Sequence, residues 1–219
     1  MHMIGDIYHL DALPKMHAQL TDTFNSGKLK PLLYRKYQLL QLAKMIQENE
    51  ERIQEALMAD MMRPAFETNF AELTATLYEL KNTYKHISSW SKPHKPPFSF
   101  HWSPHRRSIH KTPKGVVLII SPFNYPIFLS LVPLASALAA GNCVVIKPSD
   151  AVPKTSSLIE QLVKQYLDPE VVRVVNGGIQ ETSQLLELPW GHVLFTGSQK
   201  VGKIVAAAAA KHLTPVTLE

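Results

Sequence analysis

The sequence contains very little cysteine, since Cys143 is the one thiol among its 219 residues. A single thiol excludes an internal disulfide, and we therefore expect a reducing compartment, the cytoplasm. No apolar run reaches the roughly 18 residues that are needed to cross a membrane, so we expect no membrane-spanning segment. The first residues, Met1–Leu20, also lack the basic and then apolar layout of a secretory signal. Together these absences favour a cytoplasmic globular protein.

Acidic residues are absent from Ser91–Lys114, a segment rich in lysine, arginine and aromatic residues within a chain of net charge +5. Such a patch can bind nucleic acid, but the sequence shows no zinc spacing, no RNA-recognition signature and no helix-turn-helix. We therefore expect a solvated, proline-rich surface and no nucleic-acid partner. His101 and His105 have the spacing of zinc ligands on a helix, but Pro104 breaks a helix between them, and we expect no metal site.

The chain divides into three regions by its residue pattern. Residues 1–90 are dominated by helical periodicity. Residues 91–113 contain too many prolines for a helix, and the pieces 99–102 and 106–110 are expected to pair as a short β-hairpin. Residues 114–219 alternate short apolar runs with helical stretches. We expect this third region to bind the ligand.

The third region has the pattern of a parallel α/β protein. Short strands that are apolar along their whole length are expected where helices cover both faces of a sheet. We therefore expect a Rossmann-like parallel sheet with flanking helices, preceded by the helical region and the hairpin. The expected strands are Val116–Ile120, Asn142–Lys147, Val171–Val175, His192–Phe195 and Val216–Leu218, and the expected helices are Tyr125–Ala140, Pro153–Tyr166, Ile179–Leu186 and Gln199–His212.

Polar or glycine-rich loops follow the first four expected strands, and ligands of open parallel sheets bind at these strand ends. Asn124 presents an amide donor between two prolines, while Lys147 and Asp150 are placed to reach a ribose. Gly177 allows the backbone to approach a ligand closely. Residues 196–202 lead into a helix N-terminus, whose amides and dipole suit a phosphate. Each loop taken alone also has a structural interpretation, because turns commonly contain these residue types.

The order of these loops is more specific than any one of them. Four strings follow one another along the chain: Phe123-Asn124-Tyr125-Pro126, Ala140-Gly141-Asn142-Cys143-Val144-Val145-Ile146-Lys147-Pro148-Ser149, Phe195-Thr196-Gly197-Ser198 and Thr217-Leu218-Glu219. With these strings the sequence is similar to the aldehyde dehydrogenase superfamily, and to its class 3 or fatty-aldehyde branch, over about residues 10–219.

The resemblance implies a role for each matching position. Asn124 corresponds to the side-chain donor that stabilises charge on the aldehyde oxygen. Lys147 and Asp150 correspond to the residues that hold the adenosine ribose, although many members have glutamate in place of this aspartate. Glu219 corresponds to the general base that activates water. The remaining cofactor contacts are expected at Ile120, Gly177, Gly197, Ser198, Gln199, Lys200, Val201 and Gly202.

The resemblance also implies the reaction, which is NAD(P)-dependent oxidation of a small-molecule aldehyde to a carboxylic acid. We expect NAD as the cofactor, with NADP also usable, and a homo-oligomer for the full-length enzyme. The chain ends at Glu219, before the nucleophilic cysteine of the family, so we expect an inactive amino-terminal fragment. The sequence leaves open which aldehyde is the substrate.

Other assignments fit the sequence less well. Gly197–Lys203 resembles the start of a phosphate-binding P-loop, but Ile204 stands where serine or threonine would hold magnesium. Cys143 is a poor nucleophile candidate because it lies within an apolar strand. A different class of function, a non-catalytic truncated module that binds nucleotide or a partner chain, remains the alternative.

Overall fold

A computed structural model describes residues 12–98, 100–102, 105 and 107–219, and a five-stranded parallel sheet lies at its centre. The strands follow the order β3-β2-β1-β4-β5, and every neighbouring pair is parallel. The chain enters the sheet in the middle, at β1, adds two strands on one side and then two on the other. The strands are β1 (Val116–Ile120), β2 (Cys143–Lys147), β3 (Val172–Val174), β4 (His192–Phe195) and β5 (Val216–Leu218).

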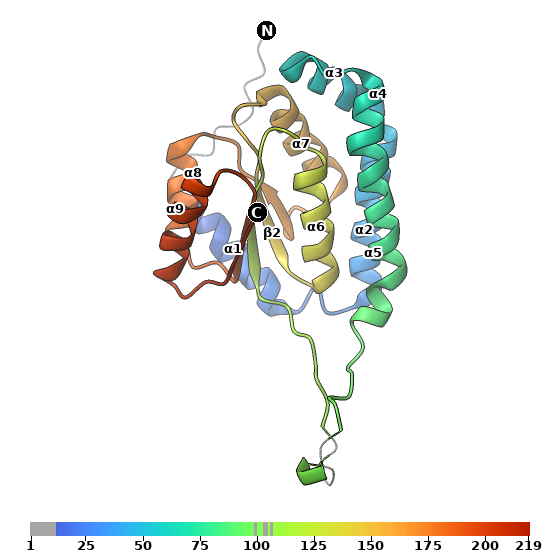
Figure 1. Cartoon of the computed structure of the whole chain (residues 1–219), viewed down its shortest axis with the longest axis vertical. Coiled ribbons are helices and arrows are strands. Elements are labelled where there is room, and N and C mark those ends of the chain that lie inside the picture. Colours follow the sequence, from blue (N-terminus) through green and yellow to red (C-terminus); the bar gives the residue numbers. More distant parts are fainter. Residues whose placement is uncertain (1–11, 99, 103–104, 106) are drawn as a thin grey trace.

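Helices cover both faces of the sheet (Figure 1). On one face lie α1, α8 and α9, and on the other α6 and α7 pack against β1, β2 and β3. Helices α2 and α5 form a further layer outside α6, and α3 packs against α7. The bounds are α1 (Ala12–Ser26), α2 (Leu32–Glu48), α3 (Glu50–Met61), α5 (Ala75–Trp90), α6 (Phe128–Ala140), α7 (Pro153–Tyr166), α8 (Ile179–Leu186) and α9 (Gln199–Ala210).

Strands β1 and β2 are buried at every position, because the sheet is covered on both faces. The expected fold class, a parallel α/β sheet with flanking helices, is confirmed. All five strands lie where the apolar runs predict them, and two are slightly shorter than expected. The elements whose predicted bounds agree with the structure are Val116–Ile120, His192–Phe195, Val216–Leu218, Pro153–Tyr166 and Ile179–Leu186.

The described part of the amino-terminal region is helical, as its periodicity predicts. Helices α2 and α3 separate at Asn49, and α3 ends at Met61, after which Met62, with a φ of 56°, turns the chain out of the helix. A short helix α4 (Ala65–Glu67) then continues through a π-helical segment, Thr68–Thr74, into α5. This π-helical segment lies against the start of α6, where Ile127 N and Phe128 N donate to the Glu72 carboxylate.

The proline-rich segment extends from the sheet as a narrow arm (Figure 1). His94 and Ile109 form an isolated antiparallel bridge through backbone hydrogen bonds of 3.2 and 2.8 Å. The expected strand over 99–102 is wrong in its described part, since Phe100–Trp102 is a turn of 3-10 helix. Proline has no backbone N–H for a ladder, which limits pairing along this arm. Ser99, Ser103, Pro104 and Arg106, which belong to the expected hairpin or its turn, lie outside the described residues.

Cys143 lies in β2 with no exposed surface. Burial raises the pKa of its thiol to about 12, well above the ordinary value. The prediction that this thiol is buried is confirmed, and a thiol in this environment packs as a small apolar side chain. Among the helices of the described residues, none is both long enough and apolar enough to cross a membrane.

Candidate cofactor and catalytic site

The carboxyl ends of the central strands form one edge, and the loops predicted to bind ligand leave from it. In the pairing register, Ile120 lies beside Lys147 on one side and beside Phe195 on the other. The register continues one residue further, since Ser121 N donates to Lys147 O at 3.1 Å and Thr196 N donates to Ile120 O at 3.2 Å. Loops that are far apart in the sequence are therefore neighbours in space.

Lys147 is a buried cation at this edge, with 4% of its surface exposed. Its Nζ donates to Pro148 O at 2.7 Å. Burial lowers the pKa of Lys147, and the negative charges of Asp150 and Glu181 partly oppose that shift. An ammonium group has more donors than one carbonyl can satisfy, so it can also bind the hydroxyls of a sugar.

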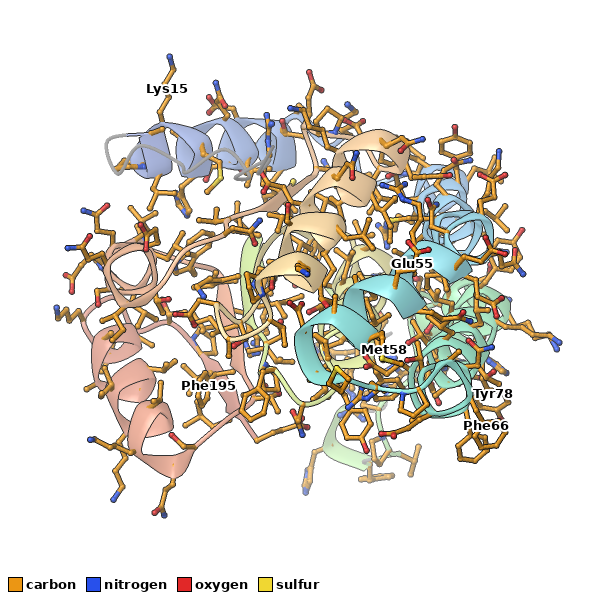
Figure 2. The ribbon with its side chains drawn as sticks, turned by 90° about the horizontal axis from the view of Figure 1, so that it is seen from above. Lys15, Glu55, Met58, Phe66, Tyr78 and Phe195 are labelled. Atoms are coloured by element: carbon orange, nitrogen blue, oxygen red, sulfur yellow. The ribbon has the colours of Figure 1, made fainter. Side chains whose placement is uncertain are left out.

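A cleft of about 820 Å³ opens next to Pro148, between the carboxyl edge of the sheet and α3. Asp150 and Gly177, two residues singled out from the sequence, both line it. Seen from above the strand ends, α3 with Glu55 lies on one side of the molecule and Phe195 on the other (Figure 2). The sequence analysis missed the α3 wall, because helical periodicity does not show which distant loop a helix will face. This wall consists of Arg52, Glu55, Ala56 and Ala59.

The loop after β3 has no room for side chains at Gly177 and little at Gly178. Gly177 has a φ of 145°, a conformation that favours glycine, and a Cβ there would overlap the side chain of Glu181. The Glu181 side chain accepts a hydrogen bond from Gly178 N at 2.7 Å and so caps the N-terminus of α8. A Cβ on Gly178 would lie 3.3 Å from Oδ2 of Asp150. The loop therefore brings bare backbone close to the Asp150 carboxylate.

The loop after β4 leads into the N-terminus of α9. Ser198 caps this helix, since its Oγ accepts from Val201 N at 3.4 Å. A Cβ on Gly197 would lie 2.6 Å from the ring of Phe195, so glycine lets the loop pass over that ring. The partial positive charge of a helix N-terminus attracts anions such as phosphate. The first turn of α9 consists of the predicted cofactor residues Gln199, Lys200, Val201 and Gly202.

Glu219 follows β5 beside the same loop. Its N donates to Phe195 O and its O accepts from Gly197 N, both at 3.0 Å. Thr196 Oγ1 donates to its Oε2 at 3.5 Å. Glu219 lines a separate groove of about 400 Å³ beside α6, and not the cleft that contains Asp150. The predicted base and the predicted ribose contacts thus lie at two places along the edge.

Asn124 lies exposed in the loop between β1 and α6. Its backbone O accepts from Nη2 of Arg63 at 2.6 Å, and the Arg63 guanidinium lies 4.9 Å from the centroid of the Tyr125 ring. The sequence analysis did not identify Arg63 as part of the site. Its one signal was a cation next to Pro64, at the break between two helical stripes.

No group of three or more histidine, cysteine, aspartate or glutamate residues within the described ranges is arranged to hold a metal ion. The edge presents a buried amine at Lys147, the carboxylates of Asp150 and Glu219, the side-chain amide of Asn124 and the N-terminus of α9. Together these groups suit a ligand with sugar hydroxyls and phosphates.

A family model described as "Aldehyde dehydrogenase family" matches residues 14–219. Human aldehyde dehydrogenase family 3 member B1 is 42% identical over 210 residues, which are 96% of this chain and 45% of that protein. A mouse "Aldehyde dehydrogenase, dimeric NADP-preferring" is 42% identical over 198 residues, or 90% of this chain and 44% of that protein. The structure of substrate-bound Staphylococcus aureus AldH matches with a TM-score of 0.91 and 39% identity, covering 94% of this chain and 45% of that one. This chain therefore spans about half the length of the relatives it matches.

Proposed function

The chain belongs to the aldehyde dehydrogenase family, and we propose that it is the dinucleotide-binding portion of an enzyme that oxidises an aldehyde to a carboxylic acid. One observation supports this above the others. The buried Lys147 stands at the carboxyl edge of a parallel sheet, in a chain that matches the family from residue 14 to residue 219. Because the chain spans about half of its relatives, the activity is proposed for the chain together with a catalytic portion.

The residues at the edge fit NAD or NADP. Lys147 and Asp150 would bind the adenosine ribose, and the first turn of α9, capped by Ser198, would bind the pyrophosphate. Gly197 and Gly177 leave space where the backbone must approach the ligand. When bound, the dinucleotide supplies the hydride acceptor of the oxidation.

Two further residues act on the substrate in this proposal. The side-chain amide of Asn124 donates a hydrogen bond to the aldehyde oxygen as negative charge develops there. The carboxylate of Glu219 accepts a proton from the water that releases the acid product. Cys143 is fully buried, so the attacking thiolate comes from outside these 219 residues.

Two measurements test the proposal. Isothermal titration calorimetry of NAD into the chain is expected to show saturable one-site binding. A chimera in which this chain replaces the matching segment of S. aureus AldH is expected to oxidise aldehydes with NAD. A chimera that folds and binds NAD but forms no acid would contradict the catalytic part of the proposal. It would favour the alternative of a binding module.

We also expect NAD to bind more tightly than NADP, and Asp150→Ser to improve NADP binding about tenfold. The 2′-phosphate of NADP would lie close to the Asp150 carboxylate if that residue holds the ribose. Two unit charges about 6 Å apart repel by roughly 3 kcal/mol at an effective dielectric constant of about 20, and the exposure of Asp150 reduces this value. Titration of both cofactors into the two proteins measures the effect.

Glu55→Gln is the matched control for this prediction. Glu55 is an exposed carboxylate that lines the same cleft from α3, so its removal changes the charge of the cleft but not the ribose contact. We expect it to improve NADP binding by less than about twofold, since exposed charges are screened by solvent. Tighter binding of NADP than of NAD by the unsubstituted chain would contradict the expected preference. This outcome has to be tested directly, because one mouse relative is described as NADP-preferring.

A further inference from the structure

A fully buried acid, Glu72, connects the loop that follows β1 to the rest of the molecule. It lies in the π-helical segment between α4 and α5, and its side chain has no exposed surface. One carboxylate oxygen accepts from the backbone amides of Ile127 and Phe128, at 2.7 and 3.1 Å, at the start of α6. The other accepts from the guanidinium group of Arg63. Glu72 thus holds the end of the loop directly and reaches its middle through Arg63.

Arg63 extends this connection to Asn124. Its Nη2 donates to the Asn124 carbonyl at 2.6 Å while its Nη1 pairs with Glu72. The Arg63 side chain is only 10% exposed and Glu72 has no exposed surface, so the charge-assisted hydrogen bond between them forms away from bulk water, where it is strong. A planar guanidinium serves a carboxylate and a carbonyl at once with a fixed geometry. Arg63 therefore fixes the peptide unit that joins Asn124 to Tyr125.

The buried ion pair of Arg63 and Glu72 is poorly explained by a contribution to fold stability alone. A buried ion pair loses hydration that its attraction often fails to offset, and apolar replacements are often neutral or stabilising. Thr68, Glu72 and Thr76, all fully buried, place polar side chains where apolar ones would pack more favourably. π-helical segments are also rare, and they occur frequently at functional sites. Of these polar groups, Glu72 contacts the chain directly after the loop that presents Asn124.

We propose that Arg63 and Glu72 are positioning residues for the Asn124 side chain. Glu72 orients Arg63, and Arg63 fixes the backbone from which the Asn124 amide projects. The inference rests on the proposed function, in which that amide stabilises charge on the aldehyde oxygen. Such a donor has to be held within about 0.5 Å of its productive position before the reaction begins. Because Asn124 is exposed on a loop, contacts from other elements have to supply that order.

The test is NMR spectroscopy of the chain with isotopically labelled asparagine. The signal that disappears in Asn124→Asp is assigned to Asn124. The main variant is Arg63→Met combined with Glu72→Gln. The glutamine keeps an acceptor for the amides at the start of α6, and no buried charge is left unpaired. We expect the backbone order parameter of Asn124 to fall from about 0.85 to below about 0.6. An Asn124 that stays as ordered as in the unsubstituted chain overturns the inference.

Arg63→Lys keeps the protein testable if the double variant does not fold. It preserves the charge beside Glu72 but not the planar fork, so we expect Asn124 to lose order to an intermediate degree. Glu67→Gln is the matched control, because Glu67 contacts Arg63 Nε at 3.3 Å but is exposed and lies away from the Asn124 contact. This control is expected to leave the order of Asn124 unchanged. A variant that lowers only the melting temperature would show a structural role and overturn the inference.

NAD titration of the same samples separates this inference from the proposed function. The variants leave the ribose and pyrophosphate contacts untouched, so NAD affinity is expected to stay within about twofold. Lost order at Asn124 with unchanged NAD affinity supports the positioning role. Absence of NAD binding from every sample contradicts the proposed function and leaves the order measurement valid. Retained order at Asn124 together with NAD binding overturns the positioning role alone.

Discussion

The 219-residue chain by itself is expected to form no NADH from NAD and aliphatic aldehydes, short or long. The proposed reaction needs a thiolate held close to both the aldehyde carbon and the nicotinamide. The one thiol of the chain, Cys143, lies in β2 with no exposed surface. With its pKa raised to about 12, roughly one thiol in ten thousand is ionised at about pH 8. Both access and ionisation therefore exclude it as the nucleophile.

NADH fluorescence and thiol titration measure these two expectations separately. An aromatic disulfide reagent, dithiobis(nitrobenzoate), is expected to label Cys143 only after the protein is unfolded in guanidinium chloride. Cys143→Ser serves as the control, with protein free of host dehydrogenases. Turnover that disappears in Cys143→Ser would assign this cysteine as the nucleophile, against the burial seen here. Turnover that survives the change would mean that the chemistry uses no cysteine of this chain.

The raised pKa of Cys143 also makes stability depend on pH. The folded thiol has a higher pKa than the unfolded one, so the contribution of this group to stability is fully present below about pH 9. It is lost as the pH rises from there toward about 12, because the unfolded chain ionises first. Alkaline conditions are therefore expected to expose the thiol by unfolding the protein, which defines the pH range for the labelling experiment.

The sheet could be predicted closely from the sequence because its strands are continuous apolar runs separated by clear loops. Val116–Ile120 is buried along its whole length, which leaves few alternative structures for it. The helix Ala12–Ser26 was not singled out, although it packs against β1 and β2. Its buried residues, Leu13, Met16 and Leu20, recur at helical spacing, but this stripe of three was overlooked. The hairpin prediction failed at Phe100–Trp102, because alternation among prolines does not supply ladder donors.

The candidate site was only partly predictable for a different reason. Lys147 and Asp150 follow one strand directly, so the rule for parallel sheets locates them without knowledge of the fold. Arg63 and Glu72 contact a loop more than fifty residues further along the chain. Such contacts depend on how the helical layers pack, and local periodicity does not contain that information. Glu72 had one local signal, since it is a charged residue next to Leu73 in the apolar stripe of this helical region, and it was overlooked.

Lys147→Met is expected to weaken NAD binding by roughly 10- to 150-fold while changing the free energy of unfolding by less than about 1 kcal/mol. In the proposed site, the ammonium group makes charge-assisted hydrogen bonds to the ribose, which methionine cannot replace. Methionine has a similar length and an apolar, flexible side chain, so it fits the buried position. It also removes the desolvation cost of a buried charge, which offsets the lost hydrogen bond to Pro148 O.

The pH dependence of stability gives this prediction a second readout. Burial lowers the pKa of Lys147, so the charged amine destabilises the folded protein relative to the unfolded chain. This destabilisation decreases as the pH rises from the lowered pKa of the folded state toward the pKa of the unfolded chain, because the folded protein releases the proton first. The stability of the unsubstituted chain relative to Lys147→Met is therefore expected to increase with pH in that window. Denaturant melts of both proteins over an alkaline pH series measure the difference.

Lys154→Met is the matched control, since Lys154 is an exposed lysine of α7 that lines the cleft beside Pro148 and Asp150. Its removal takes away the same charge from the cleft, so any loss of NAD affinity that comes from general electrostatic attraction will appear there as well. We expect a change of less than about twofold, because solvent screens an exposed charge. Equal losses in both variants would mean that the cleft attracts the cofactor by net charge alone. A loss confined to Lys147→Met, with stability maintained, would place the ribose at the buried amine.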